Sequence, residues 1–322
     1  YLEPTLVHYI GDLAAGLDKA GIETKQRFLM QSNGGVMPFQ AAIAGGKTVH
    51  TLFSGPAAGA EAAAYLAADD AKTGLVTLDM GGTSTDVCLV VDSKPSLSGE
   101  TEVDGLPIRT PVLDIVTVGA GGGSICWQDD GGMLRVGPVS AGADPGPACY
   151  GRGGDRPAIT DAHMLRGTIR AETFLGGKMS VDVSASSRVF EALSEKFHLS
   201  LEEMADSAVR VADANIVGAI QLVSTERGRD PRDYVLVPFG GAGPLHAARV
   251  AEELGIRTIL VPPNAGVLSA YGLLASDFLQ YETQTRRIPL AADAPGLVRE
   301  VFSQLRDQAT ASFQNLGVTG KL

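Results

Sequence analysis

The chain is poor in cysteine, in tryptophan and in positive charge. Its 322 residues include three cysteines and one tryptophan, and 26 lysines and arginines stand against 37 aspartates and glutamates. Cys88, Cys126 and Cys149 form no CxxC pair and are odd in number, so the sequence predicts neither a zinc knuckle nor a disulfide framework. The formal net charge of -11 argues against nucleic acid or an anionic membrane as the main partner, because both attract basic surfaces.

Long apolar runs are also missing. No stretch approaches the length needed to cross a bilayer, and the start, YLEPTLVHYIGDL, lacks the basic, apolar and small-residue sections of a signal peptide. The scarcity of cysteine and the lack of these sections predict a cytoplasmic protein in a reducing compartment. With 44% hydrophobic and 20% charged residues, the chain is long enough for two core-bearing units.

Glycine is abundant, with 40 residues, and one glycine pair stands between two aspartates in LDMGGTSTDV at residues 78–87. The β-branched, apolar runs on both sides predict a hairpin between two buried strands. Backbone amides and hydroxyl groups in its turn can converge on an anion, because a glycine pair allows close backbone approach. The donors belong to Gly81, Gly82, Thr83, Ser84 and Thr85. The loop therefore suits a phosphate, and a tight hairpin with polar turn residues is the alternative.

Asp79 and Asp86 bracket this loop and are the candidate catalytic carboxylates. Mg²⁺ in proteins commonly binds few carboxylates together with water and phosphate oxygens. The loop is not of the Walker type, because no Gly-Lys-Ser/Thr follows it and the next segment has the pattern of a strand. The two aspartates therefore fit Mg²⁺ beside a phosphate.

A second glycine turn, PFGGAGPLHA at residues 238–247, lies between a predicted strand and a predicted helix. Its glycines open the helix, whose N-terminus can accept the edge of a nucleotide. Close packing of helix on sheet explains such a turn equally well. Another helix, rich in alanine, begins near Pro56, and Ser54 and Gly55 lie at its start, which is open to an anion.

Hydrophobic periodicity predicts further helices and strands of an α/β chain. Helices are expected at 4–20, 201–226, around 265–275 and at 297–316, and strands are expected before Gly34, at 112–118 and at 258–263. The Gly- and Pro-rich segment 129–160 is expected to be an ordered loop rather than a linker.

Four other side chains are expected to have structural roles. Asp161 and His163 have strand-like spacing for one metal face, but hydrogen bonding within the protein is the favoured role. His246, in the first turn of its helix, is expected to pack or cap rather than act as a base. Trp127 could stack on a ligand, and burial under the sheet is the simpler account.

The chain resembles the hydantoinase A and 5-oxoprolinase family. The matching stretches are MQSNGGVM, TLFSGPAAGA, LDMGGTSTDV, VGAGGGSI, VGPVSAGADPGPACYGRGG, STERGRDPRD and PFGGAGPLHA. The resemblance implies an actin-like, sugar-kinase-like ATPase of the ribonuclease H-like α/β class, which opens a cyclic amide such as 5-oxoproline or a hydantoin. ATP would activate the lactam carbonyl by phosphorylating its oxygen. A B-type subunit or domain is implied as partner, and relatives include subunits of ATP-dependent ketone carboxylases.

The resemblance also implies roles for individual residues. The β- and γ-phosphates would contact Gly81, Gly82, Thr83 and Ser84, and Asp79 would lie near the metal and its waters. The ribose and base would lie against Gly240, Gly241, Ala242 and Gly243. Ser54 and Gly55 would open the helix nearest the interdomain cleft.

One family feature is missing, namely an upstream Asp-Gly-Gly-Thr phosphate loop. We therefore expect residues 1–70 to hold the end of a first lobe and its connecting helix, and residues 71–322 to form the second lobe. Because the chain also starts without methionine, we expect a fragment of a longer protein, inactive by itself, rather than a degenerate or subunit-split form. A non-catalytic docking module for a B-type subunit is the competing function. The substrate and the choice between monomer and homo-oligomer stay open.

Overall fold

A computed structural model describes residues 3–24, 26–44, 47–67, 74–99, 101–103, 105–108, 110–276, 278–279 and 281–315. The chain forms two compact units, of which the first comprises Tyr1–Ala57, Leu97–Leu113 and Ser276–Leu322 and the second Ala58–Ser96 and Asp114–Ala275. These bounds differ from the division expected at residue 70, which stays a prediction about the lobes. The chain passes from the first unit to the second inside α3, which spans Ser54–Leu66, and it returns to the first unit at Leu97 and at Ser276. No change of composition in the sequence marks these crossings.

The first unit contains α1 (Glu3–Lys19), the hairpin of β1 (Phe28–Met30) and β2 (Val36–Pro38), α2 (Phe39–Ile43) and the 3₁₀ turn η1 (Thr48–Thr51). Two short strand pairs, β6 (Leu97–Ser98) with β9 (Val112–Leu113) and β7 (Thr101–Val103) with β8 (Leu106–Ile108), and the helix α9 (Ala294–Asn315) complete it. Ile10, Met37, Phe39 and Ala42 form a small buried core. The expected first and last helices are confirmed, although residue 316 lies outside the described residues.

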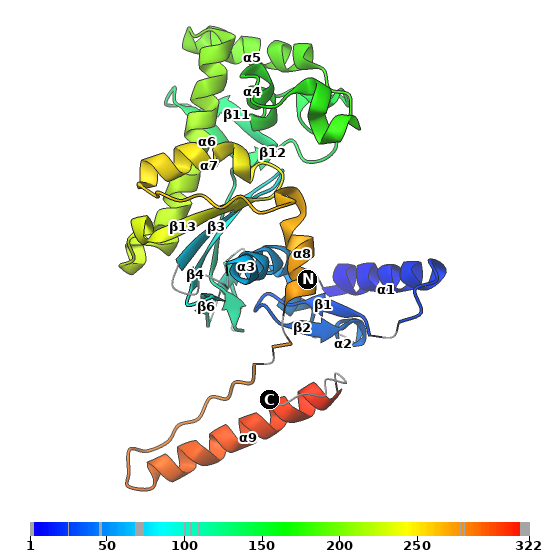
Figure 1. Cartoon of the computed structure of the whole chain (residues 1–322), viewed down its shortest axis with the longest axis vertical. Coiled ribbons are helices and arrows are strands. Elements are labelled where there is room, and N and C mark those ends of the chain that lie inside the picture. The colour runs from blue at the N-terminus through cyan, green and yellow to red at the C-terminus, as the bar shows by residue number, and fades with distance from the viewer. Residues whose placement is uncertain are drawn as a thin grey trace. The chain divides into compact units, whose positions relative to one another are not determined.

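The second unit is built on one mixed sheet (Figure 1). Its strands are β3 (Gly74–Met80), β4 (Thr85–Val91), β5 (Lys94–Pro95), β10 (Ile115–Val118) and β13 (Tyr234–Phe239). The order is β10-β4-β3-β13, with β5 paired to β4, and β13 is parallel to β3 whereas the other pairs are antiparallel. The hairpin predicted at residues 78–87 is confirmed as β3 and β4.

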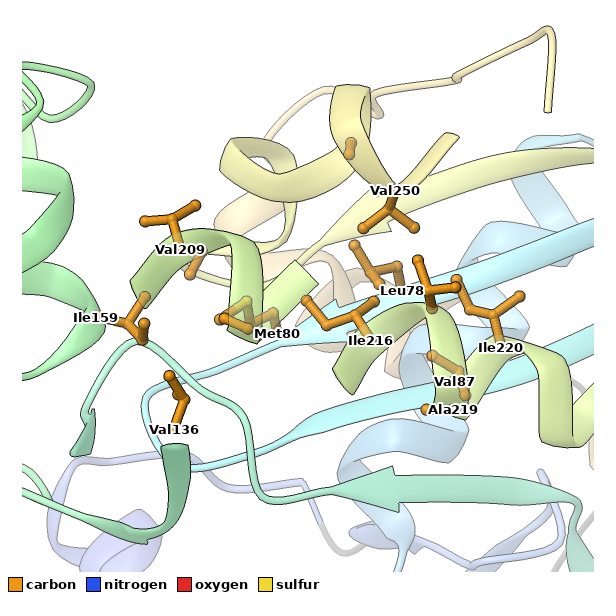
Figure 2. Close-up of a cluster of buried hydrophobic side chains, with 14 of the residues drawn as sticks. Leu78, Met80, Val87, Val136, Ile159, Val209, Ile216, Ala219, Ile220 and Val250 are labelled. Atoms are coloured by element: carbon orange, nitrogen blue, oxygen red, sulfur yellow. The ribbon is translucent and has the colours of Figure 1, made fainter. Parts of the chain in front are cut away.

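Helices cover both faces of this sheet. Figure 2 shows Leu78 and Met80 of β3 packed with Ile216 and Ile220 of α6 (Leu201–Val223) and Val250 of α7 (Gly243–Leu254). The opposite face packs Leu75, Val237 and Phe239 against alanines of α3 (Ser54–Leu66) and Leu268 of α8 (Leu268–Ala275). Because side chains alternate along a strand, Asp79 shares this second face with Leu75.

Most of the remaining elements of the second unit lie between the sheet strands in sequence, and one 3₁₀ turn follows β13. They are the hairpin of β11 (Ser124–Gln128) and β12 (Leu134–Ser140), α4 (Ile159–Leu165), α5 (Val183–Phe197) and the 3₁₀ turns η3 (Ala148–Tyr150), η4 (Ala171–Gly177), η5 (Thr225–Arg227), η6 (Pro231–Asp233) and η7 (Ala265–Val267). Helix α6 begins at a capping box in which Ser200 and Glu203 satisfy each other's backbone amides.

Two sequence predictions need correction here. The segment 129–160 is not one loop, since β12 occupies its first half and pairs with β11. The strand expected at 258–263 is reduced to a single bridge between Ile259 and Leu236, because two prolines end the segment and leave little backbone to pair. None of the described helices is both long and apolar enough to span a membrane.

Candidate functional site

The turn between β3 and β4 is the centre of the candidate site. Met80 pairs with Thr85, and the turn closes where the Gly81 amide donates to the Ser84 carbonyl at 3.1 Å. Gly81, Gly82 and Thr83 are exposed. The Gly81 amide is thus occupied within the turn, which leaves the amides of Gly82 and Thr83 as the backbone donors for an anion.

The direction of these two amides follows from the carbonyl groups before them. The Gly81 carbonyl accepts from the Gly122 amide at 3.0 Å, and the Gly82 carbonyl accepts from the Gly123 amide at 2.6 Å. In a trans peptide the C=O and the following N–H point in opposite directions. The N–H groups of Gly82 and Thr83 therefore point away from residues 119–123, and no described residue accepts from them.

Residues 119–123 form a bracing loop behind the hairpin. A Cβ atom on Gly121 would lie 2.6 Å from the Thr83 carbonyl carbon, and one on Gly123 would lie 2.8 Å from the Gly82 oxygen. Only glycine permits this approach of two backbones. In the sequence these glycines stand out only as part of the stretch VGAGGGSI, which gives no sign of the bracing role.

The second glycine turn meets the same end of β3. Gly240 has a φ of +79°, and a Cβ atom there would lie 2.5 Å from Asp79 Oδ1 and from the Met80 oxygen. The Ala242 amide donates to the Met80 carbonyl at 3.0 Å. The two motifs, far apart in sequence, therefore form one surface, on which Gly241 is exposed.

Asp79 and Asp86 lie opposite each other on β3 and β4. Burial, followed by the negative charge of Asp86, raises the pKa of Asp79 to about 6, and a hydrogen bond from Ser269 opposes the shift. Burial also raises the pKa of Asp86, and a hydrogen bond from Thr117 opposes it. A cation beside the pair would favour the ionised form of both carboxyl groups.

The carboxylate pair fits Mg²⁺ bound together with phosphate. Within the described ranges, no group of three or more His, Cys, Asp or Glu side chains could hold a metal ion. One or two carboxylates are what Mg²⁺ takes from a protein when water and phosphate complete its coordination. The residues present are therefore suited to a metal that arrives with a nucleotide.

Three of the residues expected to contact a nucleotide are buried in this structure, so their contact with a nucleotide stays a prediction. Thr85 is fully buried, and its hydroxyl group donates to the Ala120 carbonyl at 2.5 Å. Ala242 and Gly243 are buried at the start of α7. In the second glycine turn Gly241 is exposed, and the two residues that follow it are buried.

The sequence profile of the hydantoinase/oxoprolinase family matches residues 1–282. The chain belongs to this family. It is 34% identical over 325 residues to the caprolactamase subunit alpha of Pseudomonas jessenii, which covers 99% of this chain and 46% of the relative. The 5-oxoprolinase of Saccharomyces cerevisiae is 36% identical over 331 residues, or 98% of this chain and 25% of the relative.

Solved structures agree with this assignment. The nucleotide-free structure of an ATP-dependent acetone carboxylase matches with a TM-score of 0.80 and 26% identity over 97% of this chain and 44% of the other. The caprolactamase structure from Pseudomonas jessenii matches with a TM-score of 0.78 and 32% identity over 100% of this chain and 46% of the other. The expected α/β class and family are confirmed, and the chain spans less than half the length of these relatives.

In this hydantoinase/oxoprolinase chain, Ser54 and Gly55 form the first turn of α3. Ser54 is half-buried and Gly55 is exposed. A Cβ atom on Gly55 would meet nothing within 4 Å. Both belong to the first unit, whereas the hairpin belongs to the second, so their contact with a nucleotide stays a prediction.

Asp161 has the structural role that was favoured for it. It lies on α4 rather than on the strand that its spacing suggested, and it is fully buried. Its carboxylate accepts hydrogen bonds from the amides of Ala148, Cys149 and Ala158 and from the hydroxyl group of Ser186. Four donors within the protein therefore satisfy this carboxylate. Its hydrogen bonds connect the segment that precedes α4 with helix α5.

Two histidines that lie in separate elements meet inside the second unit. His246 contacts Asp213 through Nδ1 at 2.5 Å and His163 through Nε2 at 3.2 Å, and all three are buried. Burial, followed by the charges of His246 and neighbouring arginines, lowers the pKa of His163 to about 3, so its ring is neutral. Because both nitrogens of His246 have partners, the structure confirms a packing role for it.

Helix α4, which carries His163, also supports the bracing loop. His163 lies on α4, and Thr160 on the same helix donates both its amide, at 2.7 Å, and its hydroxyl group, at 2.8 Å, to the Gly122 carbonyl. Gly122 in turn donates to Gly81 in the hairpin. Sequence reasoning missed this connection because its members are far apart in the chain and carry no shared motif.

Proposed function

We propose that the complete protein uses ATP to open a cyclic amide of the 5-oxoproline or hydantoin type. Membership of the hydantoinase/oxoprolinase family supports the proposal, as do relatives named 5-oxoprolinase and ATP-dependent caprolactamase. The observation that carries it is the hairpin itself. The amides of Gly82 and Thr83, which have no acceptor among the described residues, and the paired carboxylates of Asp79 and Asp86 lie in one β-hairpin, a combination that suits a magnesium–phosphate group.

The roles of the residues follow from their exposure and charge. The Gly82 and Thr83 amides and the Ser84 hydroxyl group would bind phosphate oxygens, and Asp79 and Asp86 would orient hydrated Mg²⁺. Bound ATP would supply the phosphoryl group that makes an amide carbonyl a better electrophile.

The exposed and half-buried residues of the other turns would hold the rest of the nucleotide. Gly240 and Gly241 would lie against the ribose and base, and Ser54 and Gly55 would offer a helix N-terminus to the anion. We also propose a B-type partner subunit and a cytoplasmic location. The subunit name of the caprolactamase relative supports the partner.

A ketone carboxylase subunit is the second candidate, favoured by the structural match to acetone carboxylase. ATP turnover by the complete protein, with any partner subunit encoded beside it, distinguishes the two. The substrates to compare are 5-oxoproline, caprolactam, hydantoin and acetone, the last with and without bicarbonate. Stimulation by a cyclic amide supports ring opening, and stimulation by acetone only with bicarbonate supports carboxylation. Nucleotide binding with no stimulated turnover would instead support a docking module.

A further inference from the structure

An apolar groove of about 530 Å³ is lined by residues of the β11–β12 hairpin, of α5 and of the segment before α4. Trp127, Val139, Pro157 and Leu193 supply apolar lining, and Arg156 and Lys196 supply charge. Nothing in the proposed ATP chemistry uses these side chains. The groove is wide open to solvent, whereas sites for small molecules commonly enclose most of the ligand.

Trp127 is the largest apolar side chain of the groove. It is 42% exposed, so the burial expected from sequence is wrong, because β11 belongs to a two-stranded sheet with β12 and not to the main sheet. The indole nitrogen donates to the Gly137 carbonyl at 2.8 Å, which fixes the ring. Val139 is 53% exposed beside it. A fixed and exposed tryptophan loses little side-chain entropy when a partner covers it, which is typical of residues that dominate binding.

The charges of the groove have one sign. Its lining contains Arg156 and Lys196 and no carboxylate, although the whole chain has a net charge of -11. Neither side chain forms an ion pair within the described part of the chain. Two free cations beside apolar walls complement a ligand that combines apolar side chains with carboxylates.

We infer that this groove docks an apolar segment of a partner chain that carries carboxylates next to its apolar side chains. The apolar side chains cover Trp127 and Val139. The carboxylates pair with Arg156 and Lys196. An extended or helical segment fits an open groove, since it gains contacts along the length of the groove rather than by enclosure.

Two peptides and the fluorescence of Trp127 test this inference. One peptide is amphipathic with leucine, phenylalanine and glutamate, and the other has lysine in place of each glutamate. Trp127 is the one tryptophan of the 322-residue chain, so its emission reports on the groove directly. The charge-reversal variant carries Arg156→Glu and Lys196→Glu. The matched control carries Arg170→Glu and Lys178→Glu, which change the net charge equally at exposed residues outside the lining.

We expect the glutamate peptide to bind the parent chain and shift the Trp127 emission to the blue. Charge reversal in the groove should weaken this binding about tenfold or more, whereas the control should bind as the parent does. The lysine peptide should bind the groove variant better than the parent. Failure of the glutamate peptide to bind, or equal loss in the control, would overturn the inference. An equal shift with equal affinity from free 3-phenylpropionate would overturn it in favour of a small-molecule site.

Discussion

Two glycine-rich turns of the second unit are similar in sequence, but one is exposed to solvent and the other packs closely against another backbone. In the hairpin turn, a Cβ atom on Gly81 or Gly82 would meet nothing within 4 Å, and both residues are exposed. In the bracing loop, Gly121 is buried and a Cβ atom there would overlap the hairpin backbone. Glycine in the first leaves the turn open to solvent, and glycine in the second allows two backbones to touch. The difference separates an exposed turn from the loop that supports it.

The largest effect is expected at the carboxylate beside the exposed turn. Asp79→Asn keeps the size of the side chain but removes the charge that would orient hydrated Mg²⁺. Substrate-dependent ATP turnover by the complete protein should fall about 10²- to 10³-fold, and nucleotide affinity should fall much less. Asp130→Asn, at an exposed position outside the site, is the matched control. A rate within about twofold of the parent would remove Asp79 from the active site.

The same substitution should change how stability depends on pH. The pKa of Asp79 lies at about 6 against a usual value of 3.8, so the folded protein binds this proton more tightly than the unfolded chain does. Its contribution to stability is therefore full below the usual pKa and is lost as the pH rises through about 6. The loss is at most about 3 kcal/mol, and partial exposure reduces it.

Asp79→Asn does not undergo this loss, because its amide does not ionise. The variant should be about 1 to 3 kcal/mol more stable than the parent at pH 8, and the gap should shrink toward about pH 4. Guanidinium unfolding of both proteins at the two pH values measures it. A variant that is less stable at pH 8 would show that the carboxylate serves the fold instead.

Gly121→Ala tests the bracing loop. The added methyl group would overlap the backbone of Thr83, so the hairpin must move or the brace must open. We expect a loss of about 1 to 3 kcal/mol in the free energy of unfolding, seen as a lower thermal midpoint. Gly218→Ala on α6, where a Cβ atom meets no other element, is the control and should match or exceed the parent. Equal midpoints for Gly121→Ala and the parent would contradict the bracing role.

Gly82→Ala and Gly82→Val test the exposed turn. Because the protein leaves this space open, stability should change by less than about 0.5 kcal/mol. In the complete protein, alanine should weaken nucleotide binding about tenfold and valine should weaken it more, since the side chain occupies the place of a phosphate. Calorimetric titration with ATP and Mg²⁺ measures the affinity. Unchanged affinity for both variants would rule out a phosphate at this turn.

Local sequence patterns predicted the elements that carry the motifs. Apolar runs on either side of the glycine pair predicted β3 and β4, and helical periodicity predicted α6, whose buried side includes Met204 and Ile216. The same reasoning failed where pairing is not local. Ile259 lies in an apolar run that sequence alone cannot distinguish from a full strand, and β12 was hidden by the glycines and prolines around it.

The sequence predicted the kind of candidate site, but not the burial and contacts of its individual residues. The sequence predicted phosphate and metal binding for Asp79, Asp86 and the glycine turns, and the structure brings Asp79 and Gly240 together. Thr85 has the same hydroxyl group as Thr83, and only the position of the Ala120 carbonyl decides that it is buried and occupied. The His163–His246 contact joins residues 83 positions apart and has no local signal.

The sequence by itself determined the family, the α/β class and the glycine turns, because these depend on residue order and on conformations that glycine allows locally. The tertiary structure alone decided which glycines face solvent and which face another backbone. It also decided that the Gly82 and Thr83 amides have no acceptor among the described residues, since their direction depends on hydrogen bonds to Gly122 and Gly123 about 40 residues away. Tertiary packing sets both the exposure of these glycines and the direction of these amides. It depends on contacts between residues that are far apart in the sequence, which no local pattern reveals.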